Sequence, residues 1–112
     1  MGLFDWFNLN SKNIEALVEE AAGIDGSVVV DVRTPEEYRA GYIPGSVNVP
    51  LDRLEGVRTV ADKTTPLYVY CRSGARSASA AGVLRRSGYE KVTDMGGILS
   101  WKGRVVTGGE AR

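Results

Sequence analysis

The feature that most restricts the fold is a repeated order of short apolar runs, polar residues and helical segments. The first apolar run covers residues 27–32 (SVVVDV) and is followed by a helical segment at 35–39. The second covers residues 66–70 (PLYVY) and is followed by a longer helical segment at 75–86. Continuous apolar runs of this kind are typical of parallel strands covered on both faces. The order therefore predicts an α/β fold with three layers, α/β/α, and a mainly parallel central sheet of about five strands.

Local signals mark the ends of the helices. Thr34 followed by Pro35, with Glu36 and Glu37 in the first turn, is typical of a helix start. Both acidic residues are interpreted as charges that favour the helix N-terminus. Gly88 is expected to end the longer helix, because glycine commonly follows the last helical turn.

A first helix is expected over residues 11–23, with Asn10 or Ser11 as its N-cap and Gly23 at its end. The other expected elements are two short strands, a helical turn and a last short helix introduced by Gly96 and Gly97, over residues 46–49, 91–95, 51–57 and 98–101. A chain of 112 residues is the usual size for one domain.

The single domain is expected to cover residues 11–107, with an N-terminal extension at 1–10 and a tail at 108–112. The extension begins with the apolar sequence MGLFDWF. We interpret this segment as packing back over the first helix or a groove, with contact to a partner or a second copy as the alternative. The expected oligomeric state is a monomer or a weak homodimer.

Charge and composition exclude several functional classes. Fourteen Lys and Arg residues balance fourteen Asp and Glu residues, so no overall field attracts nucleic acid or an anionic membrane. The N-terminus lacks the features of a secretory signal, and no apolar run is long enough to cross a membrane. These observations predict a cytoplasmic protein without nucleic-acid or membrane partners.

The chain contains one cysteine, Cys71, and no histidine. A single cysteine excludes an internal disulfide, and the lack of imidazole excludes Cys-His and Ser-His-Asp catalysis and most zinc sites. No glycine-rich nucleotide fingerprint is present. We therefore expect neither a metal nor an organic cofactor.

Cys71 follows a predicted strand and begins the sequence CRSGARS, which leads through Gly74 into a helix. Such a loop aims backbone N–H groups at one point, and the helix dipole together with Arg72 and Arg76 favours a thiolate. Cys71 is therefore predicted to be a nucleophile that needs no base. An inert buried cysteine is the alternative. Arg72 is more easily explained as a solvated charge than Arg76, since a cation in the first helical turn opposes the dipole unless an anion lies nearby.

Two stretches, residues 31–50 (DVRTPEEYRAGYIPGSVNVP) and 71–77 (CRSGARS), resemble the signature sequences of rhodanese domains, and the order of the elements is similar to that of single-domain rhodaneses. The resemblance implies a rhodanese-like fold and a thiosulfate sulfurtransferase in which Cys71 carries a persulfide. The residues implied to bind the substrate are Arg72, Ser73, Gly74, Ala75, Arg76 and Ser77. The resemblance further implies an anionic sulfur donor such as thiosulfate, and a thiol, cyanide or a carrier protein as the sulfur acceptor. Many members have histidine where this chain has Tyr42, which we interpret as a structural position.

Two other functions are alternatives. A cysteine phosphatase or arsenate reductase would use a similar thiolate, but such phosphatases have one residue more between the cysteine and the arginine than the four that separate Cys71 from Arg76. A rhodanese-like binding module is the other, although inactive members commonly lack the cysteine. Asp31 and Arg33 are expected to form an ion pair that maintains the fold, or else to support the cysteine loop.

Overall fold

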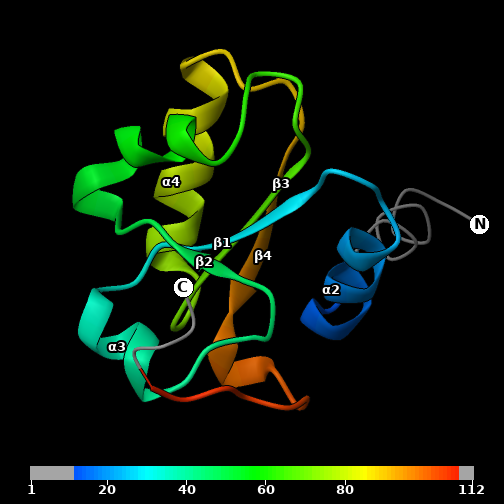
Figure 1. The fold of residues 1–112 in the computed structure, drawn as a ribbon, viewed down its shortest axis with the longest axis vertical. Helices are drawn as coiled ribbons and strands as arrows, with labels where there is room; N and C mark the ends of the chain where they lie inside the picture. The colour runs from blue at the N-terminus through cyan, green and yellow to red at the C-terminus, as the bar shows by residue number, and fades with distance from the viewer. Residues whose placement is uncertain (1–11, 109–112) are drawn as a thin grey trace, which may run out of the picture.

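The computed structural model describes residues 12–108. Its elements in chain order are α2 (Ile14–Ala22), β1 (Val28–Asp31), α3 (Pro35–Ala40), β2 (Val47–Asn48), η1 (Leu51–Thr59), β3 (Leu67–Cys71), α4 (Ala75–Arg86), β4 (Val92–Gly97) and η2 (Ile98–Ser100), where η marks a 3₁₀ helix. The four strands form one sheet in the order β2-β1-β3-β4, and each neighbouring pair is parallel. This arrangement confirms the predicted α/β fold with a parallel sheet (Figure 1).

The prediction of about five strands was too high for the described part of the chain. Residues 105–106 make only one isolated antiparallel bridge, between Tyr42 and Val106. The partner segment of Tyr42 follows directly on α3, which ends at Ala40, and the amide of Gly108 donates a hydrogen bond to the carbonyl oxygen of Arg39 in that helix, so the pairing does not extend into a ladder.

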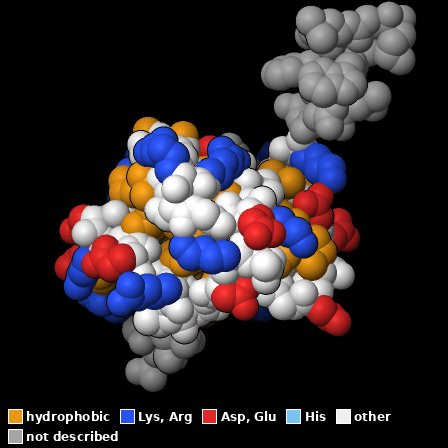
Figure 2. All heavy atoms as spheres, turned by 90° about the horizontal axis from the view of Figure 1, so that it is seen from above, with side chains coloured by type: hydrophobic (Ala, Val, Ile, Leu, Met, Phe, Trp, Pro, Cys, Tyr) orange, Lys and Arg blue, Asp and Glu red, His pale blue; other side chains and the backbone are white. Residues whose placement is uncertain are grey.

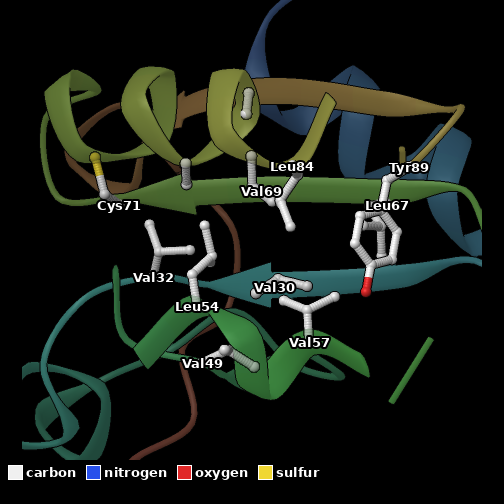
Figure 3. Packing of buried hydrophobic residues seen from close by; sticks show 12 residues of the cluster. Val30, Val32, Val49, Leu54, Val57, Leu67, Val69, Cys71, Leu84 and Tyr89 are labelled. Carbon is white, nitrogen blue, oxygen red and sulfur yellow. The ribbon is translucent and has the colours of Figure 1, made fainter. Parts of the chain in front are cut away.

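The central strand β3 supplies side chains to both faces of the sheet. Successive side chains of a strand point to opposite faces. The core on one face is therefore built from Leu67, Val69 and Cys71 against α4 and η1 (Figure 3). Tyr68 and Tyr70 belong to the core on the other face, which α2 covers (Figure 1).

The helix ends follow local capping signals. The side chain of Asn13 accepts a hydrogen bond from the amide of Ala16 and begins α2, later than expected, whereas Asn10 and Ser11 lie outside the described residues. Thr34 and Glu37 form a capping box at the start of α3. The longer helix α4 has the predicted bounds.

The surface shows no separation of charge in the view of Figure 2, where Lys and Arg side chains lie beside Asp and Glu side chains. Within residues 12–108, no helix has the length and apolar character needed to cross a bilayer. The longest described helix, α4, has 12 residues, whereas a spanning helix needs about 20.

Candidate active site

Cys71 is the last residue of β3 and lies at the start of the loop that leads into α4. The loop turns back at Gly74, whose φ of 112° is in the left-handed region that favours glycine. This turn brings the Gly74 amide within 3.0 Å of Cys71 Sγ, to which it donates a hydrogen bond. The sulfur points toward the first turn of α4 (Figure 3).

The environment of Cys71 favours its ionised form. The residue is only 1% exposed, and this burial raises the pKa of the thiol. Hydrogen bonds from the Ser77 side chain and from the backbone amides of Ser77, Gly74 and Arg76 act in the opposite direction, and together they lower the pKa below its ordinary value. The direction of this shift is the one expected of a cysteine whose thiolate accepts hydrogen bonds from the loop.

Ser77, in the first turn of α4, connects the cysteine loop to the end of β4. Its side chain is fully buried, and its Oγ lies 3.6 Å from Cys71 Sγ. The same oxygen lies 3.1 Å from the carbonyl oxygen of Gly74 and 3.3 Å from that of Gly96 at the end of β4. The sequence placed Ser77 in the loop, but its side-chain contacts follow from the fold.

Gly97 supports the cysteine loop from β4. A shift of register between β3 and β4 places Gly97 opposite Cys71. A Cβ at Gly97 would lie 2.3 Å from the carbonyl oxygen of Arg72, so the loop packs where only glycine leaves room. Gly96 and Gly97 precede a short helix as expected, since η2 begins at Ile98 with Gly97 as its N-cap, but both residues belong to strand β4 rather than to a separate turn.

The two arginines of the loop differ in their surroundings. Arg72 is exposed, and its side chain makes no ion pair or hydrogen bond within residues 12–108. Arg76 donates hydrogen bonds from Nη1 and Nη2 to the two carboxylate oxygens of Glu37, at 2.7 and 3.0 Å. Hydrogen bonding to Arg76 is the largest cause of a low pKa at Glu37. Burial acts in the opposite direction, and the resulting pKa is about 2. The anion beside Arg76 therefore comes from α3 of the chain itself.

Glu37 is a site residue that the sequence analysis did not identify. Its position in the first turn of α3 is that of an acidic residue at a helix N-terminus, and it does accept a hydrogen bond from the Thr34 amide at 3.0 Å. The Glu-Arg pair joins residues that are 39 apart in the sequence. No local signal indicates such a contact.

Asp31 and Arg33 form a buried ion pair at the carboxyl end of β1. Arg33 Nη2 lies 2.6 Å from Asp31 Oδ2 and 2.6 Å from the carbonyl oxygen of Gly41. Asn48 of β2 donates hydrogen bonds to the carbonyl oxygens of both residues. Within the described residues their side chains have no hydrogen bond to the cysteine loop, and the contacts maintain the edge of the sheet. Nearby, Tyr42 is buried and stacks on Tyr38 with 4.1 Å between ring centroids.

A pocket of about 530 Å³ lies beside the loop, between α3 and η1. It is lined by Val32, Arg33, Thr34, Pro35, Glu36, Pro50, Leu51, Asp52, Arg53 and Arg76. Binding sites in α/β folds lie beyond the carboxyl ends of the strands, where this pocket lies. Among the described residues, no group of three or more Cys, Asp, Glu or His side chains could hold a metal ion.

The chain is similar to one protein family over most of its length, since the model of the Rhodanese-like domain family matches residues 14–104. A sulfurtransferase of Allochromatium vinosum is 34% identical over 94 residues, which cover 83% of this chain and 88% of that protein. Thiosulfate sulfurtransferase PspE of Escherichia coli is 38% identical over 71 residues, 62% of this chain and 68% of PspE. A solved structure described as a rhodanese with anions from E. coli has a TM-score of 0.69 and 33% identity, covering 73% of this chain and 99% of that chain.

Proposed function

Because the chain belongs to the rhodanese-like domain family of sulfurtransferases, we propose that it moves sulfane sulfur from thiosulfate or a related donor through a persulfide on Cys71. The observation that carries this proposal is the position of Cys71 Sγ. The sulfur is buried inside the loop, 3.0 Å from the Gly74 amide, with its pKa lowered by the surrounding donors. Such donors stabilise a thiolate and equally a persulfide anion.

In the first half-reaction, the Cys71 thiolate attacks the outer sulfur of the donor. A bond forms between Sγ and that sulfur, the sulfur–sulfur bond of thiosulfate breaks, and its electron pair leaves with sulfite. In the second, a thiolate or cyanide attacks the terminal sulfur of the persulfide, and the electron pair of the broken bond returns to Sγ. Neither step as written needs a proton at Cys71, which agrees with a chain that has no histidine.

We assign recognition of the anionic donor to Arg72 and the loop amides. Arg72 is exposed and lies next to the nucleophile, so its charge is accessible to an anion. The guanidinium fork of Arg76 is occupied by both oxygens of Glu37, and an anion there would compete with that carboxylate. We therefore assign Arg76 a positioning role, in which it ties the loop to α3.

The proposal is tested by incubating the protein with thiosulfate and recording its intact mass. We expect a gain of one sulfur atom, which is lost again as thiocyanate when cyanide is added. Cys71→Ser should gain no sulfur, and since the chain has one cysteine this variant removes its only thiol. If the mass of the wild type stays unchanged while an aryl phosphate is hydrolysed, the phosphatase alternative replaces this proposal.

A further inference from the structure

The pocket between α3 and η1 is lined by apolar and acidic residues as well as by arginines, whereas a site for an inorganic anion requires mainly cationic or N–H donor groups. We propose that it binds the organic part of a small zwitterionic thiol that accepts sulfur from Cys71, with Arg53 recognising the carboxylate of that thiol. This inference rests on the proposed sulfurtransferase function and names a class of acceptor for it.

The pocket reaches the cysteine loop from one side. Arg76, which lines it, is the second residue of α4 and follows directly on the loop that begins at Cys71. Val32 also lines the pocket and belongs to the same buried cluster as Cys71 (Figure 3). A molecule in the pocket is thus a neighbour of the nucleophile's loop.

The size and apolar lining suit an organic molecule. A volume of about 530 Å³ lies within the range of roughly 300–1,000 Å³ that is usual for small-molecule sites. Thiosulfate or cyanide would fill only a small part of it. Pro35, Pro50 and Leu51, which are partly exposed, provide apolar surface for methylene groups.

The charges of the lining favour a ligand with both signs of charge. Of its three arginines, Arg33 is paired with Asp31 and Arg76 with Glu37. Arg53 is left as the accessible cation among the described residues, where its side chain is 68% exposed and has a single long ion-pair contact of 3.9 Å, to its neighbour.

That neighbour, Asp52, is 85% exposed, and Glu36 is a second acidic residue in the lining. One accessible cation beside two acidic residues would repel a small dianion. The same set can bind a carboxylate at Arg53 and an ammonium group at Asp52 or Glu36, which is the charge pattern of an amino-acid thiol.

The chemical step balances with this acceptor. The acceptor thiol enters as its thiolate after losing its proton to solvent, and its sulfur attacks the terminal sulfur of the Cys71 persulfide. The sulfur–sulfur bond to Sγ breaks, its electron pair restores the Cys71 thiolate, and the acceptor leaves as an organic persulfide. The product must then be consumed by a reaction that takes sulfur from persulfides.

The experiment compares Arg53→Ala with Arg58→Ala, a matched control on the same 3₁₀ helix whose side chain does not line this pocket. Each variant is loaded with thiosulfate, and persulfide discharge is measured with L-cysteine and with cysteamine, which lacks the carboxylate. We expect Arg53→Ala to raise the ratio of KM for cysteine to KM for cysteamine by about threefold to tenfold, the effect of losing one partly exposed charged hydrogen bond. Arg58→Ala should leave this ratio at its wild-type value.

An unchanged ratio in Arg53→Ala, or the same rise in Arg58→Ala, would overturn the inference. Failure of Cys71 to load sulfur would instead contradict the proposed function, and the pocket is then tested by binding alone. S-methylcysteine is titrated into isotope-labelled protein while the amide signals of Thr34 and Leu51 are followed. Shifts that saturate in the wild type and weaken in Arg53→Ala support the site, and equal or absent shifts refute it.

Discussion

Ser77 is within hydrogen-bonding reach of Cys71 Sγ and of the carbonyl oxygens of Gly74 and Gly96. A serine hydroxyl has one proton and can donate to only one of these acceptors at a time. A thiolate is the strongest acceptor of the three because it is charged. Ionisation of Cys71 therefore favours donation toward Sγ, whereas the neutral thiol can itself donate to Ser77.

We expect Ser77→Ala to raise the pKa of Cys71, because it removes a donor that stabilises the thiolate. Alkylation of Cys71 by iodoacetamide should then have its midpoint at a higher pH. At pH 7 its rate should fall by about threefold to tenfold. The measurement is the alkylation rate across a pH series. Ser79→Ala is the matched control, since Ser79 is exposed on the same helix, and a comparable decrease in that variant would contradict the assignment.

The end of β4 and the cysteine loop depend on each other for their shape. Leu99 donates its amide hydrogen to the carbonyl oxygen of Arg72 at 3.1 Å, which fixes the outer side of the loop. Gly97 lies behind the same peptide group, and a side chain there would meet the backbone of both Arg72 and Ser73. The loop therefore takes its position from a strand that follows it in the sequence.

Gly97→Ala should displace the loop, because backbone atoms cannot move aside as a flexible side chain can. We expect sulfur loading from thiosulfate to fall at least tenfold and unfolding stability to fall by about 1–3 kcal/mol, the usual cost of overpacking. Loading kinetics and urea unfolding measure the two effects. Gly56→Ala is the control, since its new Cβ would have 3.5 Å to the nearest atom, and a similar loss there would refute the steric explanation.

At the scale of the whole molecule, the buried pair of Asp31 and Arg33 joins several segments. The carboxylate accepts hydrogen bonds from the backbone and side chain of Arg33, which reaches on to the Gly41 carbonyl after α3. The Arg33 guanidinium carbon also lies 5.7 Å from the centroid of the Tyr70 ring in β3. The pair thus connects β1, α3 and β3 at the edge where the site is built.

Asp31→Asn should destabilise the entire domain, because it leaves the buried guanidinium without its negative partner. Breaking a buried pair typically costs about 3–5 kcal/mol, which is a large part of the stability of a small domain. Urea unfolding followed by circular dichroism measures this loss. Asp52→Asn should change stability by less than about 0.5 kcal/mol, because that side chain is 85% exposed. Equal losses in the two variants would show that the buried pair has no special role.

The fold and the cysteine loop could be predicted from the sequence because their signals are local. Apolar runs, Thr34 with Pro35, and Gly74 after Cys71 each act within a few residues, through strand propensity, capping and the left-handed conformation. Strand number and the roles of Gly96 and Gly97 were less predictable. Whether a valine pair or a glycine pair extends a strand depends on the partner strand beside it.

The sequence by itself determined that Cys71 ends a strand and begins a loop that leads through Gly74 into a helix, since that loop is built from consecutive residues. Only the tertiary structure decided that Arg76 donates hydrogen bonds to Glu37 and that the backbone of Arg72 packs against Gly97. It also decided that Arg53 lines a pocket. These contacts join segments that parallel strand pairing brings to one edge of the sheet. Which residues meet there depends on how elements far apart in the sequence pack against each other, and the spacing of residues along the chain gives no information about that packing.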